Sequence, residues 1–141
     1  MFLLFAATVV ASGQNFTCTP THVWDGDGPI WCAEGPHVRL SGIAAREMDG
    51  TCRTNQPCPP ATALQARDRL VALFGGPRGT IPTGHVIVSA PAMHCRSEGS
   101  AGGSRTAAWC TLASGADLSC AMVRTGTVLR WDRYWKNHRC R

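Results

Sequence analysis

Two aspartates near the start of the chain have the spacing of a cation-binding turn. Asp25 and Asp27 flank Gly26 in the segment VWDGDG. The glycine permits a tight backbone turn, and two carboxylates one residue apart supply the hard oxygen ligands that Ca²⁺ prefers. Taken alone, the same triplet is more often an ordinary surface turn, so the cation hypothesis needs support from other parts of the chain.

Two arginines have side chains suited to binding phosphate. Arg39 lies in the segment RLSGI, and Arg105 follows the polar segment GSAGGS. A guanidinium group can bind phosphate through two parallel hydrogen bonds, and cations around a phosphodiester stabilise the charge that develops during its cleavage. The simpler alternative for each is an exposed strand arginine that pairs with a carboxylate.

The net charge of +5 is concentrated at the C-terminal end of the chain. The 8 basic and 8 acidic residues up to Cys120 cancel, whereas the 21 residues after it carry six basic side chains and one acidic residue, Asp132. A cationic segment with aromatic residues suits nucleic acid, because phosphates attract the charge and bases stack on the rings. The predicted contacts are Arg130, Arg133, Trp135 and Lys136. A solvated helix whose aromatic side chains pack inward is an equally good explanation.

Eight cysteines in 141 residues indicate an oxidising compartment, because disulfides rarely persist in a reducing cytosol. The chain contains no CxxC pair, which disfavours a zinc site. Cys52 and Cys58 are the closest pair and are predicted to form a local disulfide. The other pairings stay open at this point, because eight cysteines allow about 105 combinations.

The N-terminal segment is typical of a secretory signal peptide. Residues 1–13 read MFLLFAATVVASG, an uncharged apolar run followed by small residues. Cleavage near Gly13 leaves a single domain over 14–141 and predicts a secreted or periplasmic protein. The alternative is a buried first strand or helix. No apolar run reaches the length of a membrane span, and we expect the domain to be a monomer.

The rest of the chain shows short strand patterns separated by turns, followed by helical patterns. The turn segments DGDGP and AEGP divide the first strands, and apolar residues at helical spacing follow Pro60. We predict strands over 16–24, 30–32, 37–40, 85–90 and 105–112, a polar loop over 97–104, and helices over 61–74, 117–126 and 131–140. This order predicts a mainly β protein, a small barrel with about three helices.

The ordered motifs of this chain resemble those of the staphylococcal-nuclease (thermonuclease) family. They are VWDGDG, RLSGI followed by a glutamate, GSRTAAW and AMVRTG, and the correspondence runs from about Cys18 to Trp135. The resemblance implies an OB-fold, a five-stranded barrel with three helices. It also implies an endonuclease that hydrolyses the phosphodiester bonds of DNA and RNA.

The resemblance assigns a role to each candidate site residue. It implies Ca²⁺ at Asp25 and Asp27, with Asp27 as a direct ligand. It implies that Arg39 and Arg105 contact the scissile phosphate. It further implies that Glu47, eight residues after Arg39, is the general base that orients the attacking water. A lone loop glutamate would otherwise be read as solvated surface.

The chain departs from the family pattern at the cation site. Family members read RLxGIDxPE, whereas this chain reads RLSGIAARE, so Ala44 stands at a usual aspartate ligand position and Arg46 at a proline position. Gly28 replaces the threonine that commonly follows DGD. The absence of one carboxylate should weaken Ca²⁺ binding, and Asp49 is a nearby substitute.

Three hypotheses for function follow. The first is a secreted or periplasmic nuclease, favoured by the joint presence of Arg39, Glu47 and Arg105. The second is a catalytically inactive OB-fold that binds nucleic acid or another polyanion, favoured by Ala44. The third is a disulfide-stabilised structural module of a toxin-like kind, which is supported by the cysteines alone.

Overall fold

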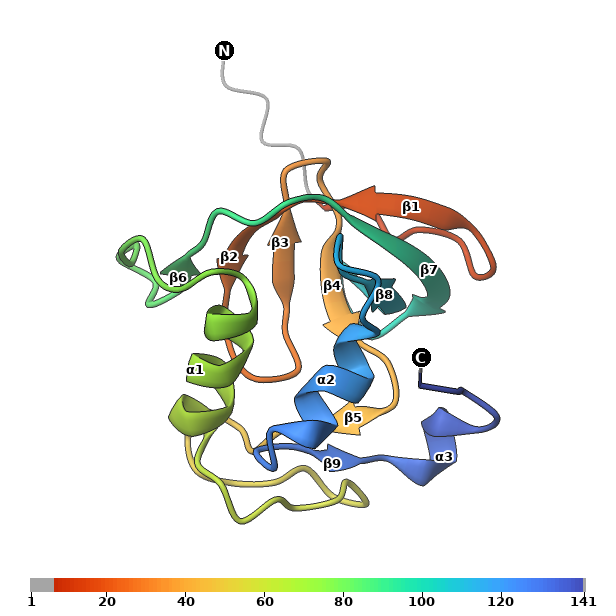
Figure 1. Cartoon of the computed structure of the whole chain (residues 1–141). Coiled ribbons are helices and arrows are strands. Elements are labelled where there is room, and N and C mark those ends of the chain that lie inside the picture. Colours follow the sequence, from red (N-terminus) through yellow and green to blue (C-terminus); the bar gives the residue numbers. More distant parts are fainter. Residues whose placement is uncertain (1–6, 141) are drawn as a thin grey trace.

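Most strands of the chain join one curled sheet. The structure is a computed structural model that describes residues 7–140, and within this range seven strands pair in the order β1-β7-β8-β4-β3-β2-β6 (Figure 1). The β4–β8 pair is parallel and the other pairs are antiparallel. The seven strands are β1 (Asn15–Cys18), β2 (Pro20–Val23), β3 (Ile30–Cys32), β4 (His37–Leu40), β6 (Val86–Ile87), β7 (Met93–Ser100) and β8 (Arg105–Thr111).

Two short strands and the helices complete the described part of the chain. Strands β5 (Ile43–Ala44) and β9 (Leu129–Arg130) form a separate two-stranded sheet. The helices are α1 (Ala63–Leu73), α2 (Leu118–Arg124) and α3 (Asp132–Trp135). A mainly β protein with three helices within residues 7–140 is therefore confirmed.

The sheet is amphipathic because its residues alternate between two faces. In β4, Val38 and Leu40 are buried while His37 and Arg39 are half-buried on the opposite face. Leu70 of α1 and Leu118 of α2 join Val38 and Leu40 in a single buried cluster. The helices thus complete the core on one face, and the polar side chains of β4 and β8 are directed to the other.

The N-termini of the two longer helices are fixed by side-chain caps. Thr62 accepts a hydrogen bond from the backbone of Gln65, whose side chain accepts one in return from the Thr62 backbone. Asp117 caps α2 by accepting a hydrogen bond from Cys120 N at 2.9 Å. These caps define where α1 and α2 begin.

The predicted loop over 97–104 is wrong in its first half, because β7 continues to Ser100. Ser97 is 1% exposed and stands where alternation requires an inward side chain. Its hydroxyl donates to Val10 O at 2.7 Å and accepts from Gly99 N at 2.9 Å, which satisfies a polar group in the interior. A buried serine hides the strand pattern from a reading based on hydrophobicity.

Two other predictions of secondary structure also need correction. The sheet has seven strands within the described range, where the sequence predicted five, since β1 and β2 are separated at Thr19 and β7 was missed. The predicted helix over 131–140 is reduced to the four residues of α3. It ends because Lys136 adopts φ +52°, a left-handed conformation that cannot continue an α-helix.

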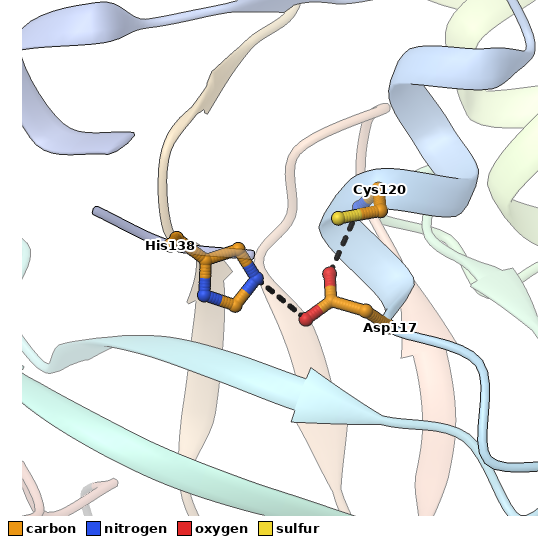
Figure 2. Close-up of side chains that lie close together, drawn as sticks. All are labelled: Asp117, Cys120 and His138. Carbon is orange, nitrogen blue, oxygen red and sulfur yellow. Dashed lines mark hydrogen bonds and ion pairs between the residues drawn. The ribbon is translucent and has the colours of Figure 1, made fainter. Parts of the chain in front are cut away.

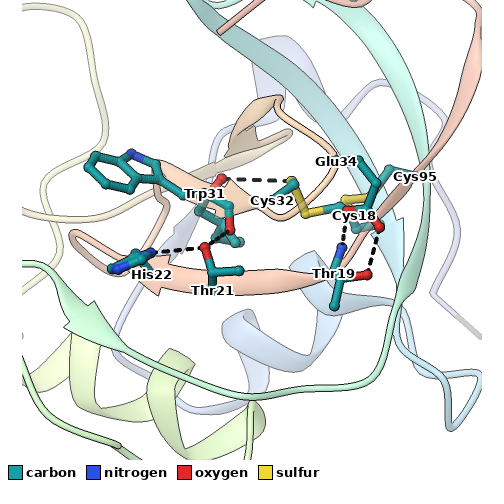
Figure 3. The surroundings of a disulfide bond; sticks show 10 residues. Cys18, Thr19, Thr21, His22, Trp31, Cys32, Glu34 and Cys95 are labelled. Carbon is teal, nitrogen blue, oxygen red and sulfur yellow. Dashed lines mark hydrogen bonds between the residues drawn. A yellow bond between two sulfur atoms is a disulfide. The ribbon is translucent and has the colours of Figure 1, made fainter. Parts of the chain in front are cut away.

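All eight cysteines form disulfides, and the predicted Cys52–Cys58 bond is confirmed. This bond closes a loop that has no helix or strand of its own. The bond in Figure 3 links β1 to β3, and another links the neighbouring strands β7 and β8. The last one ties the C-terminal segment to α2. The remaining pairs are Cys18–Cys32, Cys95–Cys110 and Cys120–Cys140.

The described part of the predicted signal peptide lies against the sheet. Residues 1–6 are outside the described range. Val10 N donates to Thr106 Oγ1 at 3.0 Å, and Gly13 N donates to Ser97 O at 2.8 Å. Cleavage near Gly13 stays a prediction, and it would remove a partner of the buried Thr106 hydroxyl. Within residues 7–140, no helix is long and apolar enough to cross a membrane.

We predict that Gly26→Ala destabilises the fold. A Cβ atom at this position would lie 2.4 Å from Ala66 Cβ in α1, so the turn or the helix must move. Overpacking of this kind costs about 1–3 kcal/mol of unfolding free energy, which urea denaturation can measure. The same substitution should cost less in an Ala66→Gly background, where the opposing methyl is gone. An equal cost in both backgrounds would contradict the steric explanation.

Candidate functional site

The five residues that the sequence analysis selected as catalytic or cation-binding candidates line a single cleft. Its volume is about 1320 Å³, and its walls come from the turn after β2, from β4 and β8, from the loop after β5, and from the C-terminal segment. These segments are far apart in the chain, so only folding brings the side chains together. The five are Asp25, Asp27, Arg39, Glu47 and Arg105.

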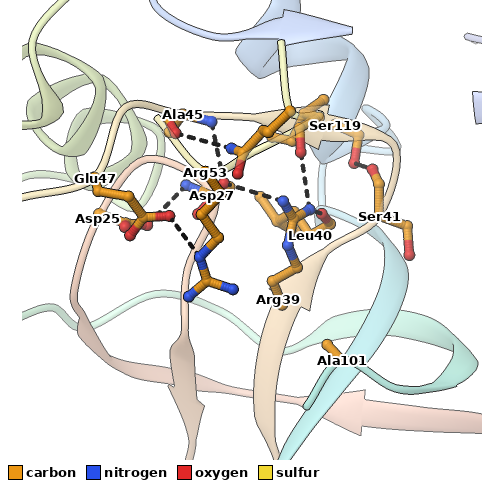
Figure 4. A network of polar contacts seen from close by, with 12 residues as sticks. Asp25, Asp27, Arg39, Leu40, Ser41, Ala45, Glu47, Arg53, Ala101 and Ser119 are labelled. Carbon is orange, nitrogen blue, oxygen red and sulfur yellow. Dashed lines mark hydrogen bonds and ion pairs between the residues drawn. The ribbon is translucent and has the colours of Figure 1, made fainter. Parts of the chain in front are cut away.

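Asp27 joins three parts of the site. Its Oδ2 atom accepts from Arg39 Nη2 at 3.2 Å and from Ala45 N at 3.0 Å (Figure 4). Its backbone oxygen accepts from Leu40 N at 2.8 Å. Asp27 is 7% exposed, and these donors compensate for the loss of hydration of its carboxylate. The turn after β2 is therefore fixed to β4 and to the segment that follows β5.

Asp25 is buried beside Asp27 without an ionic partner among the described residues. Its Oδ1 atom accepts from Asp27 N at 3.2 Å. Burial, then the charge of Asp27 and more weakly that of Glu47, raises the pKa of Asp25 from 3.8 to about 10. The site thus holds negative charge that either a proton or a cation must neutralise.

The geometry of the turn explains why glycine follows Asp27. Gly28 adopts φ +110°, a conformation that side-chain-bearing residues rarely adopt. A Cβ atom there would lie 2.4 Å from Val38 O. The turn packs directly on β4, so a residue with a side chain at this position would force the backbone to move.

The guanidinium of Arg39 is partly used to hold the fold. Nη1 donates to Leu40 O at 2.6 Å and to Ile43 O at 2.8 Å, and Nη2 contacts Asp27. These contacts occupy three of the five N–H donors of an arginine, and the other two remain for a ligand. Arg39 is therefore held rigidly at the wall of the cleft.

Arg105 lies on the same face of the sheet as Arg39. In the parallel pairing of β4 and β8, Arg105 is opposite His37 and Ala107 is opposite Arg39. The two arginines therefore lie on adjacent strands, offset by two residues along them. Arg105 Nη2 donates to Ala101 O at 2.8 Å, which orients the side chain from the β7–β8 hairpin. The sheet register brings together two cations that are distant in the sequence.

Glu47 forms an ion pair that the sequence analysis missed. Its Oε1 atom lies 3.1 Å from Nε of Arg53, whose side chain is 60% exposed (Figure 4). Arg53 follows Cys52 directly, and the Cys52–Cys58 bond constrains the loop that carries it. The sequence held no signal for this pair, because the path of the loop depends on contacts between residues that are distant in the chain.

Arg46 and Gln56 pin the same loop to the protein. Arg46 donates from Nη1 to Gly50 O and from Nη2 to Pro59 O, each at 2.8 Å. Gln56 Nε2 donates to Ala45 O at 3.1 Å. Arg46 thus contacts two separate parts of the loop. Asp49 is used within the loop, where it accepts from Thr51.

The predicted nucleic-acid contacts of the C-terminal segment divide into two groups. Trp135 is 5% exposed and packs edge-on against Trp109, so its ring is part of the interior. Arg130, Arg133 and Lys136 are exposed, and Arg130 pairs with Asp132. The buried ring agrees with the alternative of aromatic residues packed inward, and nucleic-acid binding by the exposed cations stays a prediction. Trp131 and Tyr134 also line the cleft, and the sequence analysis did not select them as contacts.

The donors at Asp25 and Asp27 fit a divalent cation that prefers oxygen. Oδ1 of Asp27 accepts no N–H among the described residues, and Asp25 lacks a cationic partner. Ala44 is buried and offers no side-chain oxygen. Ca²⁺ takes six to eight oxygen ligands, so a cation held by two carboxylates would be bound weakly and would keep several waters.

A second group of potential metal ligands lies outside this turn. Asp117, Cys120 and His138 are the only residues between positions 7 and 140 that form a compact group of three (Figure 2). Cys120 is bonded to Cys140 and has no thiolate to offer. His138 Nε2 lies 2.6 Å from Asp117 Oδ2. This group is best explained as a structural link between the C-terminal segment and α2.

Comparisons with protein-family models, with curated proteins and with solved structures find no match to this chain. The function is therefore inferred from the residues of the cleft and their geometry.

We predict that Asp25→Asn stabilises the protein at neutral and alkaline pH in the presence of EDTA. Asp25 retains its proton in the fold up to about pH 10, whereas in the unfolded chain it loses the proton near pH 3.8. Its contribution to stability is thus complete below that lower pKa and is lost as the pH rises toward the higher one. Denaturation measured from pH 4 to 9 should show a flatter decline for the variant.

Asp68→Asn is a matched control, because Asp68 is exposed on α1. It should leave the pH dependence of unfolding unchanged. A parallel shift of both variants would count against a special environment for Asp25.

Proposed function

We propose that the chain is a phosphodiesterase of the staphylococcal-nuclease type that hydrolyses DNA and RNA. The observation that carries this proposal is the convergence of two arginines, a glutamate and a buried pair of aspartates in one cleft. Arginines recognise phosphate, a carboxylate can accept a proton from water, and the aspartates can hold a cation. Nucleic acid is the polymer that fits a cleft with both arginines and aromatic rings.

In the proposed reaction, water attacks phosphorus from the side of Glu47, which accepts the proton of the water. Arg39 and Arg105 donate hydrogen bonds to the phosphoryl oxygens, where negative charge increases as the new P–O bond forms. Because both guanidinium groups are fixed by backbone carbonyls, they need little rearrangement during the reaction. The P–O bond to the leaving oxygen breaks, and this oxygen takes a proton from solvent.

Glu47 must be free of Arg53 to act as the base. The Arg53 side chain is 60% exposed and that of Glu47 is 29% exposed, and ion pairs of such exposure are worth only about 0–1 kcal/mol. Arg53 can therefore separate from Glu47 when a phosphate enters. It then becomes a third cation near the substrate.

Asp25 and Asp27 would hold a divalent cation such as Ca²⁺. When bound, the cation would supply positive charge to the phosphate. We propose that the missing carboxylate at Ala44 makes this binding weak. Introducing it as Ala44→Asp should strengthen the dependence on Ca²⁺.

The OB-fold forms part of this proposal. A curled sheet with one parallel pair in its middle, together with three helices within residues 7–140, is consistent with a barrel of that kind. Four disulfides support a protein that works outside the reducing cytosol, either secreted or in the periplasm.

A catalytically inactive protein that binds nucleic acid or another polyanion is the second candidate. It is favoured by Arg39, three of whose donors are used inside the protein, and by Ala44 at the cation site. The two functions differ in their need for Glu47, because binding a polyanion gains nothing from a carboxylate in the cleft.

We predict that the native protein cleaves single-stranded DNA and that Glu47→Gln reduces the rate about 10²- to 10⁴-fold, the range expected when a general base is removed. Arg105→Ala should reduce it about 10²-fold, because it removes a donor to the phosphoryl oxygens. Cleavage is followed on a labelled strand with Ca²⁺, Mg²⁺ or EDTA.

Glu34→Gln and Arg69→Ala are matched controls for these variants. Glu34 lies in the β3–β4 turn and Arg69 on α1, and both are exposed. They should cleave at the native rate. Binding without cleavage under every cation condition would overturn the nuclease proposal and favour the second candidate.

We predict that the combined Arg133→Gln and Lys136→Gln variant binds single-stranded DNA with a flatter salt dependence. The slope of log K against log salt is negative. Its magnitude should decrease by about 0.7 for every phosphate that the protein no longer neutralises. Arg69→Gln with Arg78→Gln removes the same charge outside the C-terminal segment and should leave the slope close to native. An unchanged slope in the first variant would show that this segment is only structural.

A further inference from the structure

The cleft has an aromatic wall that the proposed reaction does not use. Trp24 follows β2 directly and His85 precedes β6 directly, and both line the cleft. Their ring centroids are 4.9 Å apart, with an interplanar angle of 45°. Both side chains are half-buried, so part of each ring is open to solvent. The wall lies on the β2–β6 side of the sheet, away from Trp131 and Tyr134, which follow β9.

Rings on three neighbouring strands support this wall. Trp31 of β3 is opposite His22 of β2 and opposite His37 of β4 in the register of the sheet. The Trp31 ring stacks on His37 at 4.9 Å and lies 4.3 Å from His85. Figure 3 shows Trp31 and His22 on adjacent strands. His85 is therefore part of a connected set of rings rather than a lone surface histidine.

His85 is held in place, and its surroundings favour the uncharged imidazole. Its Nδ1 atom lies 2.6 Å from Thr83 Oγ1, another residue of the cleft. Burial, followed by the charges of His22, His37 and Arg67, lowers the pKa of His85. A neutral imidazole can stack on another ring without losing the hydration of a charge. The wall thus has the properties of a stacking surface rather than of an ion-binding one.

The wall is continuous with the phosphate-binding part of the cleft. Trp24 immediately precedes Asp25 in the chain. His37, which stacks on Trp31, is opposite Arg105 in the pairing of β4 and β8. A ligand that contacts both regions must carry a planar ring next to an anionic group. A nucleotide has both, whereas a sulfated polysaccharide has charge but no aromatic ring.

We propose that Trp24 and His85 form a base-stacking subsite for an unpaired base of single-stranded nucleic acid, adjacent to the phosphate that Arg39 and Arg105 contact. This inference rests on the proposed function only in taking nucleic acid as the ligand; it does not require cleavage. A base inside a duplex is stacked between its neighbours, so this wall can bind a base only from a single strand.

The subsite is tested with a phosphorothioate DNA single strand, which resists hydrolysis, and with the same backbone made entirely of abasic units. The two ligands have the same charge, and one lacks bases. We expect His85→Ala and Trp24→Leu each to weaken binding of the strand about ten-fold, the effect of removing the stacking of one base, and to leave binding of the abasic chain unchanged. His85→Phe should bind the strand almost as well as the native protein does.

His94→Ala is the matched control, because His94 is an exposed histidine of β7 that does not line the cleft. It should bind both ligands as the native protein does. Equal weakening of both ligands by His85→Ala, or no weakening of either, would overturn the subsite. Equal weakening would also identify the ligand as a polyanion recognised only by its charge.

Photochemical crosslinking tests the subsite without any substitution. A single strand that contains 5-iodouracil should attach to Trp24 or His85 in the native protein, as identified by peptide mapping. Crosslinks confined to Trp131 and Tyr134 would overturn the subsite. A protein that crosslinks at Trp24 but does not cleave DNA would retain the subsite and lose the nuclease proposal, so the two failures are distinguishable.

Discussion

The buried carboxylate of Asp27 is the contact on which the rest of the cleft depends. It accepts hydrogen bonds from Arg39 and from Ala45 N, and its backbone oxygen accepts from Leu40 N. A carboxylate in the interior is tolerated only with such partners, because removing one of them leaves an uncompensated charge. The turn after β2, strand β4 and the segment after β5 must therefore keep one relative arrangement. Gly28 makes this possible, since a Cβ atom there would collide with β4.

A second set of contacts gives shape to a long segment without regular structure. Between β5 and α1, the chain is held by Arg46, by Gln56 and by the Cys52–Cys58 bond. These contacts are spread along the segment, so its backbone is constrained at both ends and in the middle. The result is a fixed position for Arg53 next to Glu47. The apolar core of a protein of this size is small. Disulfides and arginine contacts to carbonyls therefore hold the segments that lie outside the core.

The sequence predicted the parts of this protein whose physics is local. The strand over 37–40, the helix after Pro60 and the Cys52–Cys58 bond each depend on residues that are close in the chain, and the structure contains all three. It did not predict β7, because the inward position of Ser97 is satisfied by a distant backbone oxygen. The strands β5 and β9 have two residues each, too few for any periodicity to appear. The same holds for the site. The residue types alone indicated phosphate chemistry. The ion pair of Glu47 could not be predicted, because it depends on a loop whose path is set by nonlocal contacts.

The structure also changes how strongly Arg39, Arg105 and Glu47 each support an enzymatic function. Arg39 holds Leu40 O, Ile43 O and Asp27, so the fold needs it whether or not the protein is a catalyst. Arg105 holds the β7–β8 hairpin through Ala101 O, which gives it a partial structural role. Glu47 is different, because its ionic partner among the described residues is an exposed arginine and the pair contributes little to stability. A carboxylate in a cleft of arginines also opposes the binding of a polyanion. Neither folding nor the binding of a polyanion accounts for a carboxylate at this place, so the nuclease proposal depends above all on Glu47.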